Sequence, residues 1–117
     1  MKPEYLVTGA TGFVGRRLVE RLIGMGAGVR LLVRRPEKLL PQLSAACEVI
    51  IGDLGNPASL DAAVAGVGVV FHCAANVRTW GDWSAYEAAN IRGVENLVRA
   101  VVRCNLGLQR FVHLSSV

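Results

Sequence analysis

The chain is 117 residues long, with 52% hydrophobic and 19% charged residues and a net charge of +4. This length suits one domain with a single buried core. The composition excludes a disordered segment and fits a sheet that is buried on both faces. The positive charge is scattered along helix-like segments without interleaved aromatic residues, so we expect no nucleic-acid partner.

Membrane, secreted and metal-binding classes are also disfavoured. The longest uncharged run, residues 62–77, contains glycines, a histidine and an asparagine, which indicates a buried strand rather than a membrane span. The first residues lead straight into a strand-like run, so we expect no secretory leader and a cytoplasmic protein. The cysteines Cys47, Cys73 and Cys104 lack C-x-x-C spacing, which is typical of neutral thiols in a reducing compartment. His72 and Cys73 point to opposite faces of a strand, so we expect no metal site.

Apolar runs alternate with amphipathic segments along the whole chain. The expected strands are residues 5–7, 29–33, 48–51, 69–73 and 110–114. The expected helices are residues 12–25, a short one after Pro36, one or two turns after Pro57, and a long one that begins near Ser84. Connections this short require right-handed crossovers and a parallel sheet. We therefore predict one α/β domain over residues 1–117, a Rossmann-type doubly wound sheet in three α/β/α layers with strand order 3-2-1-4-5.

Helix starts carry their own signals. Pro36 and Pro57 stand where a first helical residue would be, and Asn56 is a candidate cap before Pro57. Residues 84–87 fit the capping-box pattern for the long helix. The apolar residues of that helix recur at helical spacing, and we expect them to face the core: Ile91, Val94, Leu97, Val98, Val101 and Val102.

A glycine-rich segment lies between the first apolar run and the first amphipathic run. A strand, a tight glycine turn and a helix N-terminus form a seat for a diphosphate, because the helix start offers unpaired N–H groups and partial positive charge. The glycines allow a sharp turn and close approach to the phosphates. Each glycine alone could equally be an ordinary turn residue. Their joint position predicts a dinucleotide site formed by Gly9, Ala10, Thr11, Gly12, Phe13, Val14 and Gly15.

The end of the second expected strand indicates which dinucleotide binds. An acidic residue there would bond the ribose hydroxyls and select NAD. The chain instead has Val33 followed by Arg34 and Arg35, and a guanidinium pairs well with a 2′-phosphate. We expect NADP as the cofactor, with Arg34 as its contact, and NAD as the alternative. The competing interpretation, stronger for Arg35, is that these arginines merely end an exposed strand.

Two further strand ends supply candidate contacts. Asp53 follows the third expected strand and could accept a hydrogen bond from the adenine amino group, with Leu54 packing on the ring. The alternative for Asp53 is a cap on the following turn. The fourth expected strand ends in Cys73-Ala74-Ala75, where small side chains allow a cofactor to lie across the strand ends.

Taken in order, these motifs resemble those of an extended short-chain dehydrogenase/reductase. They are T-G-x-x-G-x-x-G, G-D-L, F-H-C-A-A, N-I-R-G-V-E-N-L and R-F-V-H-L-S-S-V, and they cover essentially the whole chain. Residues 29–36 and 80–83 are similar to the NAD(P)-dependent epimerase/dehydratase group that includes dihydroflavonol-reductase-like and 3β-hydroxysteroid-dehydrogenase-like members. The resemblance implies that Ala74 and Ala75 line the nicotinamide ribose side. It also implies that Asn90 helps to organise the active site and that Ser116 orients the substrate carbonyl or alcohol. The alternatives are that Asn90 bonds a neighbouring turn and that Ser116 ends a strand.

The resemblance also implies a reaction for which this chain lacks part of the machinery. Such enzymes move a hydride between nicotinamide and an oxygen-bearing carbon, with a tyrosine as general acid/base and a lysine four residues later. No Tyr-x-x-x-Lys occurs here, since Tyr5 is followed four residues on by Gly9 and Tyr86 by Asn90.

We therefore expect an incomplete domain, the N-terminal portion of a longer NADP-preferring oxidoreductase or epimerase that acts on a small alcohol or ketone. The 117 residues alone would be inactive, and the full-length parent would form a homodimer without membrane partners. The alternative is a non-catalytic NAD(P)-binding redox sensor or interaction module. A serine at the position of Ser116 counts against that alternative, because a sensor does not need this hydroxyl.

Overall fold

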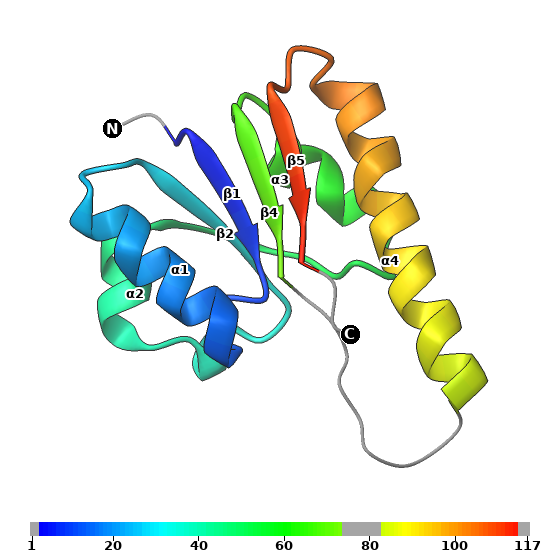
Figure 1. Ribbon diagram of the computed structural model, residues 1–117, viewed down its shortest axis with the longest axis horizontal. Helices are drawn as coiled ribbons and strands as arrows, with labels where there is room; N and C mark the ends of the chain where they lie inside the picture. Colours follow the sequence, from blue (N-terminus) through cyan, green and yellow to red (C-terminus); the bar gives the residue numbers. More distant parts are fainter. Residues whose placement is uncertain (1–2, 74–82, 115–117) are drawn as a thin grey trace.

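A parallel five-stranded sheet with helices on both faces organises the chain (Figure 1). The computed structural model describes residues 3–73 and 83–114, with the backbone alone for residues 83–89. The strands are β1 (Tyr5–Thr8), β2 (Val29–Val33), β3 (Glu48–Ile51), β4 (Val69–His72) and β5 (Arg110–His113). The helices are α1 (Phe13–Gly24), α2 (Pro41–Ala46), α3 (Asp61–Val64) and α4 (Trp83–Cys104), with 3₁₀ turns η1 (Pro36–Lys38) and η2 (Pro57–Leu60).

The strand order is β3-β2-β1-β4-β5, and every neighbouring pair is parallel. The predicted α/β class and strand order are therefore confirmed. From β1, the chain adds β2 and β3 on one side of the sheet and then crosses back to place β4 on the other side of β1. The connections that follow β1 and β4 therefore lead in opposite directions. In open α/β sheets, ligands bind at the carboxyl ends of the strands near such a point.

Two apolar cores fill the space between the layers. Consecutive residues of β1 point to opposite faces, and both Leu6 and Val7 are fully buried. Val7 packs in the core that includes Val19 of α1, and Leu6 packs in the core that includes Val64 of α3 and Leu97 of α4. Helices α1 and α2 thus cover one face, and α3 and α4 cover the other (Figure 1). The sheet is buried on both sides, as parallel sheets require.

Helix α4 buries less of its apolar surface than the sequence predicts. Leu97 and Ala100 are fully buried, whereas Ile91, Val98 and Val102 are 52%, 42% and 60% exposed. Successive residues of an α-helix are about 100° apart around its axis, so a helix that buries Leu97 turns Val98 well away from the sheet. The expectation that all these apolar residues face the core is therefore wrong.

Local details at two helix starts differ from the predictions, whereas α4 begins near Ser84 as expected. Pro36 and Pro57 do open short 3₁₀ turns, but the additional helix that begins at Pro41 was not predicted. Asn56 occupies the position before η2 without a side-chain cap bond, and the Ser59 N–H and hydroxyl donate to its backbone carbonyl at 3.0 and 2.8 Å. The predicted capping box begins at Ser84, whereas α4 begins at Trp83, and the side chains of the box lie outside those described.

The packing of α1 against β1 gives a first prediction. A Cβ atom added to Gly15 would lie 2.0 Å from the Gly9 carbonyl oxygen, so Gly15→Ala must displace the helix from the turn. We expect the free energy of unfolding to fall by about 1–3 kcal/mol, as measured by denaturation followed by circular dichroism. Gly24→Ala is the matched control on the same helix, because its Cβ would meet nothing within 4 Å. Equal stabilities of the two variants would contradict the prediction.

Candidate functional site

A cleft of about 280 Å³ opens at the carboxyl ends of β1, β2 and β3. Its walls combine the start of the glycine turn, the segment that follows β2 and the loop that follows β3. The lining residues are Thr8, Gly9, Ala10, Thr11, Leu32, Val33, Arg34, Arg35, Lys38, Gly52, Asp53 and Leu54. The fold thus brings together three groups of residues that the sequence singled out separately.

The glycine turn is built for a close approach of backbone to ligand. Gly9 has φ of +78°, in the left-handed region that favours glycine, and its carbonyl accepts a hydrogen bond from the Gly12 N–H at 3.0 Å. Gly12 is the N-cap of α1, without a side-chain cap bond and without an acidic residue in the first turn. The first-turn N–H groups have no intrahelical acceptor, so the end of α1 favours an anion.

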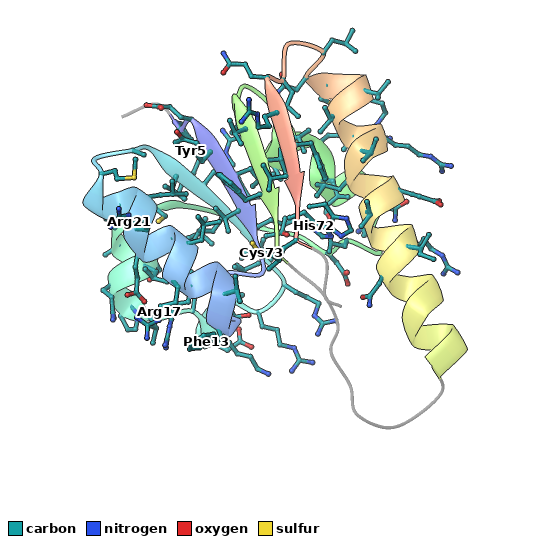
Figure 2. All side chains as sticks on the ribbon, in the orientation of Figure 1. Tyr5, Phe13, Arg17, Arg21, His72 and Cys73 are labelled. Carbon is teal, nitrogen blue, oxygen red and sulfur yellow. The ribbon has the colours of Figure 1, made fainter. Side chains whose placement is uncertain are left out.

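The side chains of Phe13 and Val14 point away from the core, with 71% and 50% exposure. The guanidinium of Arg17 lies 5.5 Å from the centre of the Phe13 ring, a cation–π contact on the outer side of α1 (Figure 2). Phe13 and Val14 are not among the residues that line the cleft. What these two residues can offer to an anion at the start of α1 is therefore their backbone N–H groups.

Positive charge dominates the wall after β2. Arg34, Arg35 and Lys38 all line the cleft, while Val33 is buried at the end of β2. Lys38 was not predicted as a site residue. The sequence feature that could have indicated Lys38 is Pro36. Pro36 opens η1, and this turn directs the chain back toward the end of β2. Arg35 also faces the cleft, although the sequence favoured a merely exposed position for it.

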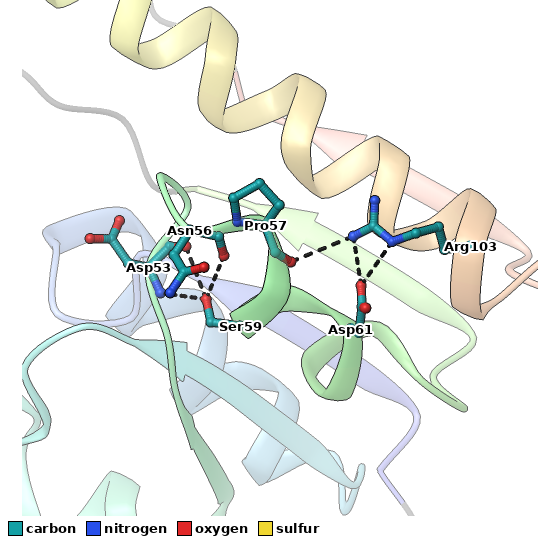
Figure 3. Close-up of polar contacts among 6 residues, drawn as sticks. All are labelled: Asp53, Asn56, Pro57, Ser59, Asp61 and Arg103. Atoms are coloured by element: carbon teal, nitrogen blue, oxygen red, sulfur yellow. Dashed lines mark hydrogen bonds and ion pairs between the residues drawn. The ribbon is translucent and has the colours of Figure 1, made fainter.

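The loop after β3 is fixed by hydrogen bonds (Figure 3). The N–H of Asp53 donates to the Ser59 hydroxyl at 3.0 Å, and that hydroxyl lies 3.1 Å from the Asp53 carbonyl. One carboxylate oxygen of Asp53 accepts from the Gly55 N–H at 2.9 Å, which is the turn-capping role given as the alternative. A carboxylate has two oxygens, so this bond is compatible with a ligand contact by the same side chain.

Buried polar contacts join the ends of β1 and β4, and a ring contact extends them to the exposed His113 at the end of β5. Thr8 Oγ1 lies 2.7 Å from His72 Nδ1 and accepts a hydrogen bond from the Cys73 N–H at 3.1 Å. The rings of His72 and His113 stack with their centroids 5.3 Å apart. His72 and Cys73 are labelled in Figure 2. Burial, with a smaller contribution from His113, lowers the pKa of His72 to about 4, so this ring is neutral at pH 7. From the sequence, we weighed His72 only as a metal ligand. Its contact with Thr8 leaves no local pattern, because the two residues are 64 positions apart.

Four predicted site residues come after β4 in the chain. Asn90 is on α4 and half-buried, and Ala74, Ala75 and Ser116 lie outside the described residues. Cys73 is free and half-buried, and burial raises the pKa of its thiol. Within residues 3–73 and 90–114, whose side chains the structure describes, no three His, Cys, Asp or Glu side chains gather as a metal site. No helix in that part of the chain combines the length and apolarity needed to cross a bilayer.

The depressed pKa of His72 predicts a pH-dependent stability. The ordinary value is 6.5 and the folded value about 4, so the unfolded chain binds more protons between these values. The free energy of unfolding should therefore fall by about 3 kcal/mol as the pH drops from 7 to 4. Urea denaturation at several pH values measures this slope, and His72→Gln should flatten it. His113→Gln should retain most of it because burial is the larger cause. An unchanged slope in His72→Gln would refute the assignment.

Comparisons with known proteins agree with this geometry. The family model for the NAD dependent epimerase/dehydratase family matches residues 5–117. The chain is 41% identical over 120 residues to a 3 beta-hydroxysteroid dehydrogenase/Delta 5-->4-isomerase of Mycobacterium tuberculosis, a match that covers 95% of this chain and 31% of the relative. The chain thus spans about a third of the length of this curated relative.

Solved structures give the same result. The crystal structure of gox2253 superimposes with a TM-score of 0.82 at 36% identity, covering 98% of this chain and 34% of that one. A mutant of uronate dehydrogenase from Agrobacterium tumefaciens, complexed with NAD, superimposes with a TM-score of 0.77 at 32% identity, covering 97% and 41%. With its strand order, its glycine turn and a family match over nearly its whole length, the chain belongs to the NAD dependent epimerase/dehydratase family.

Proposed function

We propose that this chain is the dinucleotide-binding portion of an NADP-preferring oxidoreductase or epimerase that acts on an alcohol or ketone by hydride transfer. One observation carries the proposal. A single cleft places the glycine turn at the start of α1 beside Arg34, Arg35 and Lys38, and buried Val33 stands where an acidic residue would select NAD.

The glycine turn fits a pyrophosphate. A Cβ atom at Gly12 would lie 3.4 Å from the Gly9 carbonyl oxygen, and at Gly15 it would collide with that oxygen, so glycine at these positions lets the start of α1 pack directly against the turn. The N–H groups of Phe13, Val14 and Gly15 would hold the diphosphate, with the partial positive charge of the helix end adding to the attraction. Ala10 and Thr11 complete the turn.

The remaining contacts follow from the walls of the cleft. Arg34, with Arg35 and Lys38 beside it, would hold the 2′-phosphate, because cations pair with this group where a carboxylate would repel it. Asp53 and Leu54 would bind the adenine. The family is described as NAD dependent, and three of its structural neighbours are in complex with NAD. The preference for NADP therefore rests on the residues of this chain alone.

For the reaction itself, bound nicotinamide would supply or accept the hydride. Ala74 and Ala75 follow β4 and would line the nicotinamide ribose side. Asn90 would help to organise the site, and Ser116, shortly after β5, would orient the substrate oxygen by a hydrogen bond. The chain has no Tyr-x-x-x-Lys pair to move the proton, so it should bind a dinucleotide without turnover.

The 2′-phosphate contact is tested by Arg34→Asp. The substitution removes a charge-assisted bond and adds repulsion, so we expect NADPH binding to weaken by about 1–3 kcal/mol. NADH binding should change much less. Fluorescence titration with both dinucleotides measures this, and Arg99→Asp, with the same charge change outside the cleft, is the control. Unaltered NADPH affinity in Arg34→Asp would remove this residue from the site.

The catalytic assignment is tested in a longer protein that contains this sequence followed by a Tyr-x-x-x-Lys segment. Ser116→Ala should reduce kcat by roughly 10²-fold or more, the scale of a lost group that acts in the transition state. The dissociation constant for NADPH should stay within about twofold, since this hydroxyl would bond the substrate and not the dinucleotide. Steady-state kinetics with a parallel binding titration separates the two, and full turnover in the variant would make Ser116 a structural residue.

A further inference from the structure

Two elements hold the loop that forms the adenine wall of the cleft. On one side, the Ser59 hydroxyl contacts both the N–H and the carbonyl of Asp53 (Figure 3). On the other side, the side-chain amide of Asn96 donates to the Leu54 carbonyl at 2.8 Å. Asn96 is 7% exposed and lies on α4, 42 residues further along the chain. The backbone of each wall residue is therefore fixed by a side chain from another element.

Helix α4 reaches this loop because it carries a glycine at the point of approach. A Cβ atom at Gly93 would lie 3.4 Å from Leu54 Cβ and 3.5 Å from Leu54 Cδ1, so the bare backbone of α4 lets Leu54 pack closely. Gly93 and Asn96 are three residues apart and share one face of the helix. The side chain of Leu54 thus rests on α4 at Gly93, while its carbonyl is bonded by Asn96.

We propose that Asn96 is a positioning residue for the adenine half of the dinucleotide site. The inference rests on the proposed function and adds a residue that acts through Leu54 without touching the ligand. A buried amide that donates to a loop carbonyl fixes both the orientation of that carbonyl and its distance from the helix. Apolar packing alone does not fix the orientation. Loss of this donor frees Leu54, while Arg34, Lys38 and the glycine turn keep their positions.

The residue that directly follows α4 offers a control. The side-chain amide of Asn105 donates to the carbonyls of Val64 at 2.8 Å and Val67 at 2.7 Å. These two bonds have the same chemistry and hold the end of α4 to the end of α3 and the loop that follows it. Neither Val64 nor Val67 is among the described residues that line the cleft. Loss of Asn105 therefore weakens the attachment of α4 without releasing the adenine wall.

The test compares two probes by calorimetry or NMR titration. Adenosine 2′,5′-bisphosphate carries the adenine, and inorganic pyrophosphate needs only the glycine turn. In Asn96→Ala, we expect affinity for adenosine 2′,5′-bisphosphate to fall roughly tenfold, the effect of one lost hydrogen bond, with pyrophosphate affinity changed by less than about twofold. Asn96→Leu, similar in volume and without a donor, should behave alike if the alanine variant folds poorly. Asn105→Ala should lower the melting temperature and leave both affinities within about twofold.

The outcomes separate this inference from the proposed function. If the wild-type chain binds neither NADPH nor adenosine 2′,5′-bisphosphate, the proposed function fails and the inference fails with it. If the wild type binds both and a folded Asn96 variant binds adenosine 2′,5′-bisphosphate equally well, the inference alone is overturned. Equal losses in the Asn96 and Asn105 variants would also overturn it, because the effect would then be a general loosening of α4. A selective loss of the adenine-bearing probe in the Asn96 variants supports it.

Discussion

The contact between Gly15 of α1 and the Gly9 carbonyl is the constraint on which the site depends. No side chain fits between them, since a Cβ atom at Gly15 would come within 2.0 Å of that oxygen. The helix start is thereby held directly against the turn after β1, with its uncapped N–H groups at the carboxyl edge of the sheet. Because β2 pairs with β1 in parallel register, Thr8 with Leu32, the residues that follow the two strands emerge at the same edge. The position of the cations relative to the turn follows from this pairing.

The positive charge at the carboxyl edge of the sheet is a local feature, distinct from the net charge of +4 of the whole chain. Three cations and one carboxylate line the cleft, and the carboxylate of Asp53 already accepts a turn hydrogen bond. Elsewhere, several positive charges are paired with carboxylates, as in the ion pairs Arg16–Glu20, Arg30–Glu48 and Arg103–Asp61 (the last in Figure 3). Such a cluster of cations in a cleft, beside the positive end of a helix, attracts a compact polyanion. A diffuse basic surface of the kind that binds nucleic acid would spread its charge differently.

The features that could be predicted from the sequence are those that depend on local residue patterns and on the handedness of the crossovers. The alternation of apolar and amphipathic runs, with right-handed crossovers, was enough for the strand order, and the spacing Gly9, Gly12, Gly15 was enough for the turn. Long-range pairings leave no such local pattern. Nothing near His72 announces its contact with Thr8, and nothing near Asn96 announces its bond to Leu54. The outer face of α4 was misjudged for a related reason, because periodicity identifies apolar residues without saying which of them the sheet covers.

These two long-range contacts have a common location. The chain builds its sheet in two parts, β1-β2-β3 and then β4-β5, which meet where β1 pairs with β4. Thr8 and Leu54 belong to the first part, and their partners His72 and Asn96 belong to the second. A dinucleotide laid across the strand ends would span this junction, with its adenosine on the first part and its nicotinamide reaching toward the second. Apolar packing tolerates small sliding between layers, whereas buried hydrogen bonds are directional and costly to leave unmade. The bonds of Thr8 with His72 and of Leu54 with Asn96 therefore hold the two parts of the sheet in a defined relative position beside the cleft.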